Sequence, residues 1–413
     1  MSVRKRTWTS KGVEKAAWVV DYLDSQDRRR LKTFKLKKEA DQFAATATVE
    51  VREGVHVADA ASATVLQAGR LWIAAKDRAG RERSTIDQYR QHLELHVAPF
   101  IGTTRLNALT LPALRQFEER LLDEGRSPAM VRKVVVSLGS LIADAQERGL
   151  VARNVVRDMR GRRGSSDRRA EKRAKGRLRI GVDIPAPGEV KAIVGALRGR
   201  WRPVLLAAIF TGLRASELRG LRWADVDLDR KALHVRQRAD RFNDIGQPKS
   251  EAGEREVPLP PIVVNTLREW RLICPRRDTG RKDDRGEPIK ELDLVFPNGK
   301  GKVESLANMI NRGLLPAQIR AGVTSATDEL DADGKPGLAA RYTGMHALRH
   351  FYASWCINRP QDGGLGLPPK VVQERLGHAT INLTMDTYSH LFPRGENNDE
   401  LANAERTLLG GGP

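Results

Sequence analysis

Cysteine is scarce in this 413-residue sequence, which contains only Cys274 and Cys356. Two cysteines cannot build a disulfide framework, and their separation matches no zinc-ligand spacing, so we expect a reducing compartment and no metal site. Long apolar runs are also missing: none approaches the roughly 18 residues of a membrane-spanning helix, and the N-terminus has no apolar signal segment. These absences exclude membrane-spanning and secreted classes and favour a cytoplasmic protein.

Acidic side chains are in the minority, with 52 Asp and Glu against 72 Lys and Arg, which gives a formal net charge of +20. The isoelectric point is near 10.3. An excess of this size is typical of proteins that bind a polyanion, most often nucleic acid, and an ordinary basic soluble protein is the alternative. The length allows two or three domains, each with its own core.

The pattern of apolar residues predicts a mainly helical chain with small β elements, in the α+β class. We expect residues 1–60 to form two strands, at 18–22 and 28–34, followed by a helix over 37–50. A small cationic sheet can enter a DNA groove, although lysine and arginine are equally common on a solvated sheet edge. The cations that we expect to contact DNA there are Arg28, Arg29, Arg30 and Lys32.

Residues 64–157 have helical periodicity almost throughout, with helix starts expected at Val65, Ser84, Leu111 and Ser127. They predict a compact bundle that can grip a duplex. A basic linker, residues 158–183, follows; like-charge runs of this kind are solvated and flexible, and between two DNA-contacting domains they can also track phosphates. The linker cations that we expect to do so are Arg160, Arg162, Arg163, Arg168 and Arg169.

Residues 184–396 predict a larger, mostly helical domain with one strand-rich stretch at 229–260. An apolar helix expected over 204–210 ends before Gly212, and Arg214 and Glu217 then lie three apart on one face of the next helix. A carboxylate can orient a guanidinium so that its paired donors bind a phosphate. For this pair alone, a surface ion pair of little consequence is the alternative.

A lysine lies in the strand-rich stretch of this domain. Strands expected at 232–236 and 255–259 flank a hairpin with its turn at 251–253, which places Lys249 just before the tip. A lysine there can reach a DNA groove and protonate a leaving oxygen, whereas most such lysines are solvated and inert.

Three further motifs follow near the C-terminus. His346 and Arg349 share one face of a helix that begins near Thr343. A second helix, over 369–376, stops at Gly377 and delivers His378 to a loop. Tyr388 lies on the next helical segment, where a half-buried packing tyrosine is the ordinary interpretation.

The order of these motifs resembles the tyrosine recombinase (phage-type integrase) family, whose catalytic domain uses an Arg–Lys–His–Arg–His–Tyr set. The matching motifs are TGLRASEL, the hairpin lysine, HALRH, LGH and MDTYSH. Hairpin length varies in this family, so Lys302 is a distant competitor of the hairpin lysine. Two segments depart from the family pattern: an acidic loop at 326–340 and a glycine-rich stretch at 361–368. The matching residues are Arg214, Lys249, His346, Arg349, His378 and Tyr388, with Glu217 in a supporting role.

The resemblance implies a site-specific recombinase in which Tyr388 attacks a DNA phosphate to form a 3′-phosphotyrosyl link, with His346 helping to take the tyrosine proton. It implies no cofactor and no metal, an arm-binding module at 1–60, a core-binding domain at 64–157 and a catalytic domain at 184–396. We also expect a homotetramer on double-stranded DNA core and arm sites, and an accessory protein that bends DNA or sets direction. The resemblance implies that the tail at 397–413 packs on a neighbouring protomer, and the alternative is that it covers its own domain. Such an enzyme integrates or excises a phage or mobile element in the cytoplasm of a bacterial host.

Three alternatives remain. A type IB topoisomerase-like enzyme would relax one duplex, and a DNA-binding regulator would have a decayed site. A housekeeping chromosome-resolution recombinase would lack the basic module at 1–60. Should Tyr388 not be the nucleophile, Tyr352 or Tyr342 would be the next candidates.

Overall fold

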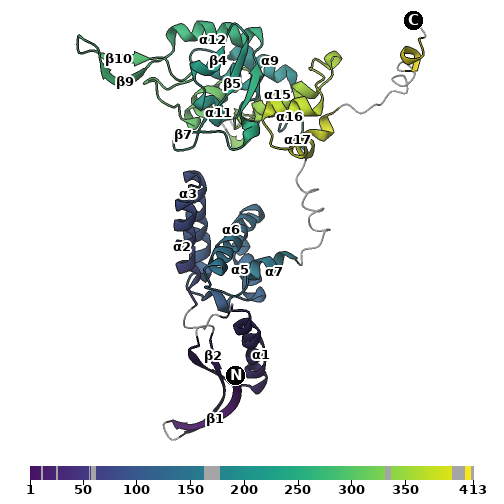
Figure 1. Ribbon diagram of the computed structural model, residues 1–413. Coiled ribbons are helices and arrows are strands. Elements are labelled where there is room, and N and C mark those ends of the chain that lie inside the picture. The colour runs from purple at the N-terminus through teal and green to yellow at the C-terminus, as the bar shows by residue number, and fades with distance from the viewer. Residues whose placement is uncertain are drawn as a thin grey trace. The chain divides into compact units, whose positions relative to one another are not determined.

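The computed structural model describes residues 1–10, 13–24, 27–54, 56, 62–161, 177–330, 336–392 and 405–410 (Figure 1). The chain divides into two compact units, residues 1–175 and 176–413. Most of the predicted linker, including Arg162, Arg163, Arg168 and Arg169, lies outside the described residues, as does the side chain of Arg160. Among the described helices, none has the length and apolar character needed to cross a membrane.

The first unit begins with a three-stranded antiparallel sheet in the order β1 (Ser2–Ser10), β2 (Val13–Leu23), β3 (Arg29–Phe34). Helix α1 (Lys37–Arg52) packs on one face, and Val20, Tyr22 and Ala40 are buried between helix and sheet. The second and third strands and the helix confirm the expectation, but β1 was missed. Its residues are almost all polar or charged, so the strand lacks the alternating apolar signal that a half-buried strand normally provides.

A helical bundle follows in the same unit, built around a core that includes Trp72, Phe117 and Leu138. Serine and threonine caps start several of its helices; the Ser127 hydroxyl, for example, accepts a hydrogen bond from the Met130 backbone N–H at 3.2 Å. The expected cap at Ser84 is wrong, because the helix begins one residue earlier and has no side-chain cap. The helices are α2 (Val65–Arg78), α3 (Arg83–Gln91), a π-helical turn (His92–Val97), α4 (Ala98–Ile101), α5 (Leu111–Asp123), α6 (Pro128–Glu147) and α7 (Val155–Gly161).

The second unit surrounds a central helix, α10 (Trp201–Thr211), most of whose side chains are buried. A small antiparallel sheet in the order β4 (Val226–Asp227), β5 (Ala232–Val235), β8 (Arg255–Pro258) packs into the same core. The other helices are α9 (Pro187–Ala196), α11 (Ala215–Gly220), α12 (Pro261–Ile273), α13 (Leu306–Asn308), α14 (Leu315–Arg320), α15 (His346–Ile357), α16 (Pro369–Leu376) and α17 (Ile381–Tyr388).

This unit also contains three two-stranded hairpins, one inside the expected strand-rich stretch at 229–260 and two beyond it. The segment at 326–340, expected to be a loop, belongs to one of them, although residues 331–335 lie outside the described part. The two hairpins beyond residue 260 escape a periodicity argument because few of their described side chains are buried. The pairs are β6 (Arg238–Ala239) with β7 (Ile245–Gly246), β9 (Arg277–Lys282) with β10 (Pro288–Glu291), and β11 (Thr324–Leu330) with β12 (Pro336–Ala340).

Candidate active site

The break after α10 depends on Gly212, which has a left-handed φ of 62°. A Cβ at this position would lie 2.2 Å from Cδ1 of Tyr352, so the turn accommodates glycine alone. Arg214 follows in an extended conformation as the residue before α11, and Glu217 lies in the first turn of that helix. The expectation that both residues share a helix face is therefore wrong for Arg214, although the pair does meet.

Glu217 holds two arginines in place. Its Oε1 lies 2.7 Å from Nη1 of Arg214, and its Oε2 lies 2.9 Å from Nη2 of Arg255. Burial raises the pKa of this carboxyl, but Arg255, Arg214 and Arg349 outweigh that effect and keep the pKa below its usual value. Glu217 is thus an ionised anchor that orients guanidinium groups.

Sequence reasoning missed Arg255, which opens strand β8. Besides its contact with Glu217, it donates from Nε to the carbonyl oxygen of Arg375 at 2.8 Å, which joins the sheet to helix α16. The signal that could have found it is weak: a charged residue that starts a core strand is also common at ordinary sheet ends.

Arg349 is almost fully buried, with 2% of its surface exposed. It donates from Nη1 to the carbonyl oxygen of Gly212 and from Nη2 to that of Leu376, both at 2.6 Å. Burial and the charge of Arg214 lower the pKa of Arg349 to about 9, which leaves it positively charged at neutral pH. Arg214 also donates to the carbonyl oxygen of Gly377 at 3.0 Å, so the two arginines bind adjacent carbonyl groups where α16 ends.

His378 leaves α16 after Gly377, which adopts the expected left-handed conformation with φ 62°. Its Nδ1 lies 2.9 Å from the buried Thr384 hydroxyl. Burial, with the charges of Arg349 and other arginines, lowers the pKa of His378 to about 3, so the ring is neutral. When the threonine hydroxyl donates to Nδ1, the single ring N–H is at Nε2.

Tyr388 ends helix α17 with only 1% of its surface exposed. Its hydroxyl lies 2.8 Å from Nδ1 of His350, and its ring is nearly parallel to that of His378, at an interplanar angle of 4°. Burial raises the pKa of Tyr388 to about 12, while Arg349 and Arg214 act in the opposite direction. The hydrogen-bond partner of this hydroxyl is therefore His350, whereas the sequence analysis expected His346 to take the tyrosine proton.

His346 is the first residue of α15 and presents part of its ring to solvent. Desolvation of the remainder, with the positive charges of Arg349 and Arg214, lowers its pKa. Its ring packs edge-on against His350, with centroids 4.5 Å apart. Five of the six predicted catalytic residues thus belong to one connected set of contacts: Arg214, His346, Arg349, His378 and Tyr388. His350 and Arg255 belong to the same set.

Lys249 lies just before the expected turn at 251–253, but the hairpin that contains it differs from the expected one. Strands β5 and β8 do pair, but β6 and β7 form a separate hairpin between them, and Lys249 follows β7 with an exposed side chain. It precedes the 3₁₀ turn Glu251–Gly253, and this turn lies against Gly377: a Cβ there would be 2.9 Å from the Ala252 carbonyl oxygen. The turn after Lys249 therefore contacts the loop that carries His378. Lys302 lies in a separate exposed turn.

The cations predicted in the N-terminal sheet fall on two faces. Arg30 pairs with Asp24, and Lys32 packs 4.2 Å above the Phe43 ring, so both side chains belong to contacts within this part of the first unit. Arg29 lies on the opposite face, paired with Asp21 at 2.5 Å. Arg28 precedes the strand and is exposed.

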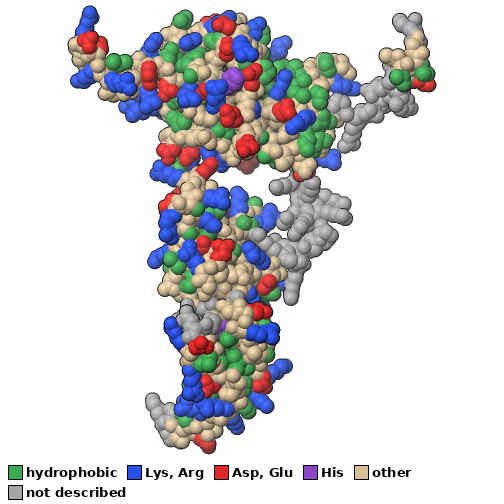
Figure 2. Space-filling model, in the orientation of Figure 1, with side chains coloured by type: hydrophobic (Ala, Val, Ile, Leu, Met, Phe, Trp, Pro, Cys, Tyr) green, Lys and Arg blue, Asp and Glu red, His purple; other side chains and the backbone are tan. Residues whose placement is uncertain are grey.

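The register of β1 adds two arginines to the helix-free face. Arg4 is opposite Val19 and Arg6 is opposite Ala17, which puts both on the same side of the sheet as Arg29. Figure 2 shows Lys and Arg side chains over the visible surface of both units. Because the strand itself was not predicted, these residues were missed as DNA-binding candidates.

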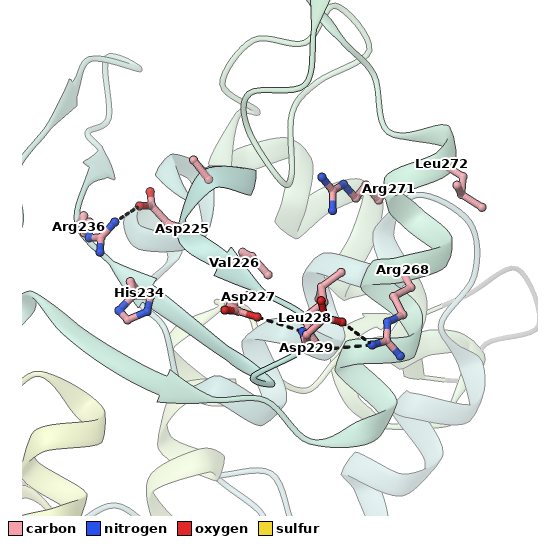
Figure 3. Close-up of a pocket in the computed structure, with 11 residues that line it drawn as sticks. Asp225, Val226, Asp227, Leu228, Asp229, His234, Arg236, Arg268, Arg271 and Leu272 are labelled. Atoms are coloured by element: carbon pink, nitrogen blue, oxygen red, sulfur yellow. Dashed lines mark hydrogen bonds and ion pairs between the residues drawn. The ribbon is translucent and has the colours of Figure 1, made fainter.

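A cavity of 530 Å³ lies between β4, β5 and the end of α12 (Figure 3). Four of its charged side chains form two ion pairs: Arg236 with Asp225 at 3.1 Å and Arg268 with Asp229 at 3.3 Å. None of the predicted catalytic residues lines it. This cavity is therefore distinct from the candidate active site.

Comparison with known proteins assigns the chain to a family. The phage integrase family matches residues 186–394. A protein named tyrosine recombinase XerC-like, from Caldanaerobacter subterraneus subsp. tengcongensis, is 25% identical over 389 residues, which span 88% of each chain.

Solved structures share the fold. The Tn1549 transposon integrase in complex with circular intermediate DNA has a TM-score of 0.58 and 19% identity, covering 84% of this chain and 100% of that one. A lambda integrase tetramer bound to a Holliday junction has a TM-score of 0.51 and 15% identity, covering 91% and 95%. With the family match over half of its length, the chain belongs to the phage integrase family of tyrosine recombinases, enzymes that break and rejoin DNA.

Proposed function

We propose that this recombinase integrates and excises a phage or other mobile DNA element and that Tyr388 is its nucleophile. The observation that carries the proposal is the convergence on one site of Arg214, Arg349, His378 and Tyr388, which come from four segments of the chain. Two guanidinium groups and neutral imidazole donors are suited to a phosphate whose negative charge grows during attack.

Each residue has a distinct role in the proposed reaction. Arg214, Arg349 and the imidazole N–H groups of His378 and His346 bind the phosphate oxygens. The Tyr388 oxygen attacks phosphorus, the bond to the 5′ oxygen breaks, and Lys249 protonates that oxygen. The 5′ hydroxyl of a partner strand then attacks the 3′-phosphotyrosyl bond and releases the tyrosine. Because the bond energy stays in the covalent intermediate, the reaction needs no nucleotide cofactor.

Binding of DNA is divided among several parts of the chain. We assign arm sites to the N-terminal sheet, where Arg4, Arg6 and Arg29 share the helix-free face. The bundle over 64–157 binds core sites, and the basic linker at 158–183 follows the phosphates between the two DNA-contacting domains. These residues contact the backbone electrostatically, so binding should weaken as salt concentration rises.

Joining two duplexes requires four active sites, so we propose a tetramer on DNA. A lambda integrase tetramer has been seen on a Holliday junction, and the two chains share a fold. In the C-terminal tail, Leu408 and Leu409 are 85% and 74% exposed, which suits packing on a neighbouring protomer. An accessory protein that bends DNA or sets direction would complete the assembly in the bacterial cytoplasm.

The test uses the full chain with DNA that flanks its own gene. Covalent protein–DNA adducts and joined products between two DNA molecules should both form. Tyr388→Phe should bind the same DNA and form no adduct. Adducts without joined products would instead indicate a topoisomerase-like enzyme, and adducts in Tyr388→Phe would move the nucleophile to another tyrosine.

A further inference from the structure

A neutral phenol is a poor nucleophile, and the surroundings of Tyr388 make its ionisation harder. Burial raises the pKa of this residue to about 12. At pH 7 a group with that pKa is ionised in only about one molecule in 10⁵. If Tyr388 is the nucleophile, as proposed above, a neighbouring base must take its proton during attack.

The polar groups of the described site differ in their ability to act as that base. Arg214 and Arg349 carry positive charge and have no lone pair to offer. His378 directs Nδ1 to the Thr384 hydroxyl, so the hydrogen bond of its ring goes to this threonine and not to the tyrosine. His350 has its Nδ1 at 2.8 Å from the hydroxyl oxygen, within the reach required for proton transfer.

The protonation state of His350 suits a proton acceptor. Burial, His346 and Arg349 lower the pKa of His350 to about 4, against an opposing effect of Asp183. At neutral pH the ring is therefore neutral, and in the tautomer with its N–H at Nε2 the Nδ1 lone pair accepts the tyrosine O–H. The charged groups around it are Arg349 on its own helix and Asp183 on the segment before α9. A bound DNA phosphate would add a negative charge that stabilises the imidazolium form.

We propose that His350 is the general base for Tyr388, a role that the sequence analysis gave to His346. As the tyrosine oxygen forms its bond to phosphorus, the O–H bond breaks and the proton moves to Nδ1 of His350. The bond from phosphorus to the 5′ oxygen breaks, and that oxygen receives its proton from Lys249. In the rejoining step Lys249 takes the proton of the attacking 5′ hydroxyl and His350 returns its proton to the departing tyrosine, so protons and charge balance over the cycle.

His350→Asn separates hydrogen bonding from proton transfer. The amide oxygen of asparagine can accept the hydrogen bond near the position of Nδ1, but it cannot hold the proton. We expect the rate of adduct formation at pH 7 to fall about 10²- to 10⁴-fold, the usual contribution of a general base. The measurement is single-turnover cleavage of a nicked duplex built from the DNA that flanks the gene.

The pH profile gives a second readout that a structural role would not change. With His350 present, the cleavage rate should be nearly level from pH 6.5 to 8.5. In His350→Asn it should rise about tenfold per pH unit, because hydroxide must then ionise the tyrosine. His346→Asn is the matched control: its rate should fall while its profile stays level.

Replacing Tyr388 with a ring-fluorinated tyrosine, which is more acidic, completes the test. The fluorinated residue should restore much of the rate in His350→Asn and little of it in Lys249→Ala, whose defect concerns the leaving oxygen. An unchanged rate or a level profile in His350→Asn would overturn the proposal. Thermal unfolding and DNA binding show whether His350→Asn is folded. If it does not fold, the test uses His346→Asn, in which His350 is intact. In that variant the fluorinated tyrosine must not restore the cleavage rate.

Failure of the proposed function has a different signature. In that case the unmodified protein forms no adduct with the flanking DNA, or Tyr388→Phe still forms one. A wild-type adduct that depends on Tyr388 but not on His350 contradicts this inference alone.

Discussion

Arg255 and Glu217 form an ion pair inside the catalytic unit, with Nη2 of the arginine 2.9 Å from Oε2 of the glutamate and side chains only 6% and 3% exposed. Removing Arg255 leaves the buried Glu217 carboxylate with Arg214 as its remaining ion-pair partner, and breaking a buried pair costs about 3–5 kcal/mol. We therefore expect Arg255→Ala to lower the free energy of unfolding by about that amount, as measured by urea denaturation.

The control for this variant is Arg268→Ala, which removes an exposed ion pair with Asp229 at 3.3 Å. Exposed pairs contribute about 0–1 kcal/mol, so this change should hardly alter stability. Equal effects of the two substitutions would show that Glu217 does not depend on Arg255.

Gly212→Ala should damage the site through the backbone. The new methyl group would lie 2.2 Å from Cδ1 of Tyr352, and the φ of 62° is unfavourable for alanine. We expect a loss of stability above 1 kcal/mol and a slower cleavage step, because the Gly212 carbonyl oxygen is one of the anchors of Arg349. Thermal unfolding and single-turnover cleavage measure the two effects.

Gly195→Ala provides the matched comparison. Gly195 lies in α9, and a Cβ there would meet nothing within 4 Å. Alanine should stabilise this helix by roughly 0.5–1 kcal/mol. If both alanine variants behaved alike, the close approach of Tyr352 would have no energetic consequence.

Acid should destabilise the catalytic unit through its buried histidines. Burial lowers the pKa of His378 to about 3 in the folded chain, against an ordinary pKa of 6.5. Between these two values the unfolded chain binds more protons, so the free energy of unfolding falls as the pH is lowered through that window. At pH 5 the loss for this one residue is about 2 kcal/mol.

Urea denaturation at pH 7.5 and pH 5 measures this effect. His378→Gln, which cannot titrate, should show a smaller decrease in stability between the two pH values than the unmodified protein. A decrease of the same size in both proteins would contradict a neutral, buried His378.

The two faces of the N-terminal sheet should respond differently to mutation. Arg6→Ala, on the helix-free face, should weaken binding to arm DNA and reduce the slope of log binding constant against log salt by about one. Lys32→Ala, which removes a contact 4.2 Å above the Phe43 ring, should mainly reduce stability. Titrations of DNA at several salt concentrations measure the slopes.

Deletion of residues 1–60 extends this prediction. It should leave cleavage of core-site DNA intact and impair complete integration. Unaffected integration by the shortened chain would remove the basis for an arm-binding role.

Local chemistry made much of the second unit predictable. Gly377 stops α16 because it adopts a left-handed conformation that other residues avoid, and this stop delivers His378. Prolines in the first helical turn marked the starts of α5 and α6 in the bundle for a similarly local reason. The resemblance to the recombinase family then supplied roles for the motif residues, and those roles remain proposals.

Strand β1 and the β6–β7 hairpin were beyond such reasoning. Of the described β1 side chains, only Val3 packs against the small apolar core of the N-terminal sheet, so the strand has no alternating apolar pattern. The β6–β7 pair is two residues long on each side, too short for a periodic signal. The turn at Glu251–Gly253 and the place of Lys249 just before it agree with the expectation, whereas the extra hairpin between β5 and β8 was missed.

By itself the sequence determined which chemical groups this recombinase carries and in what order, because helix starts, helix stops and short motifs depend on near neighbours. Only the tertiary structure decided which groups meet. The contact of Arg255 with Glu217 and that of His350 with Tyr388 each span 38 residues. Both contacts exist because separate helices and strands pack into one core, and the free energy of that packing depends on the whole unit rather than on any single segment.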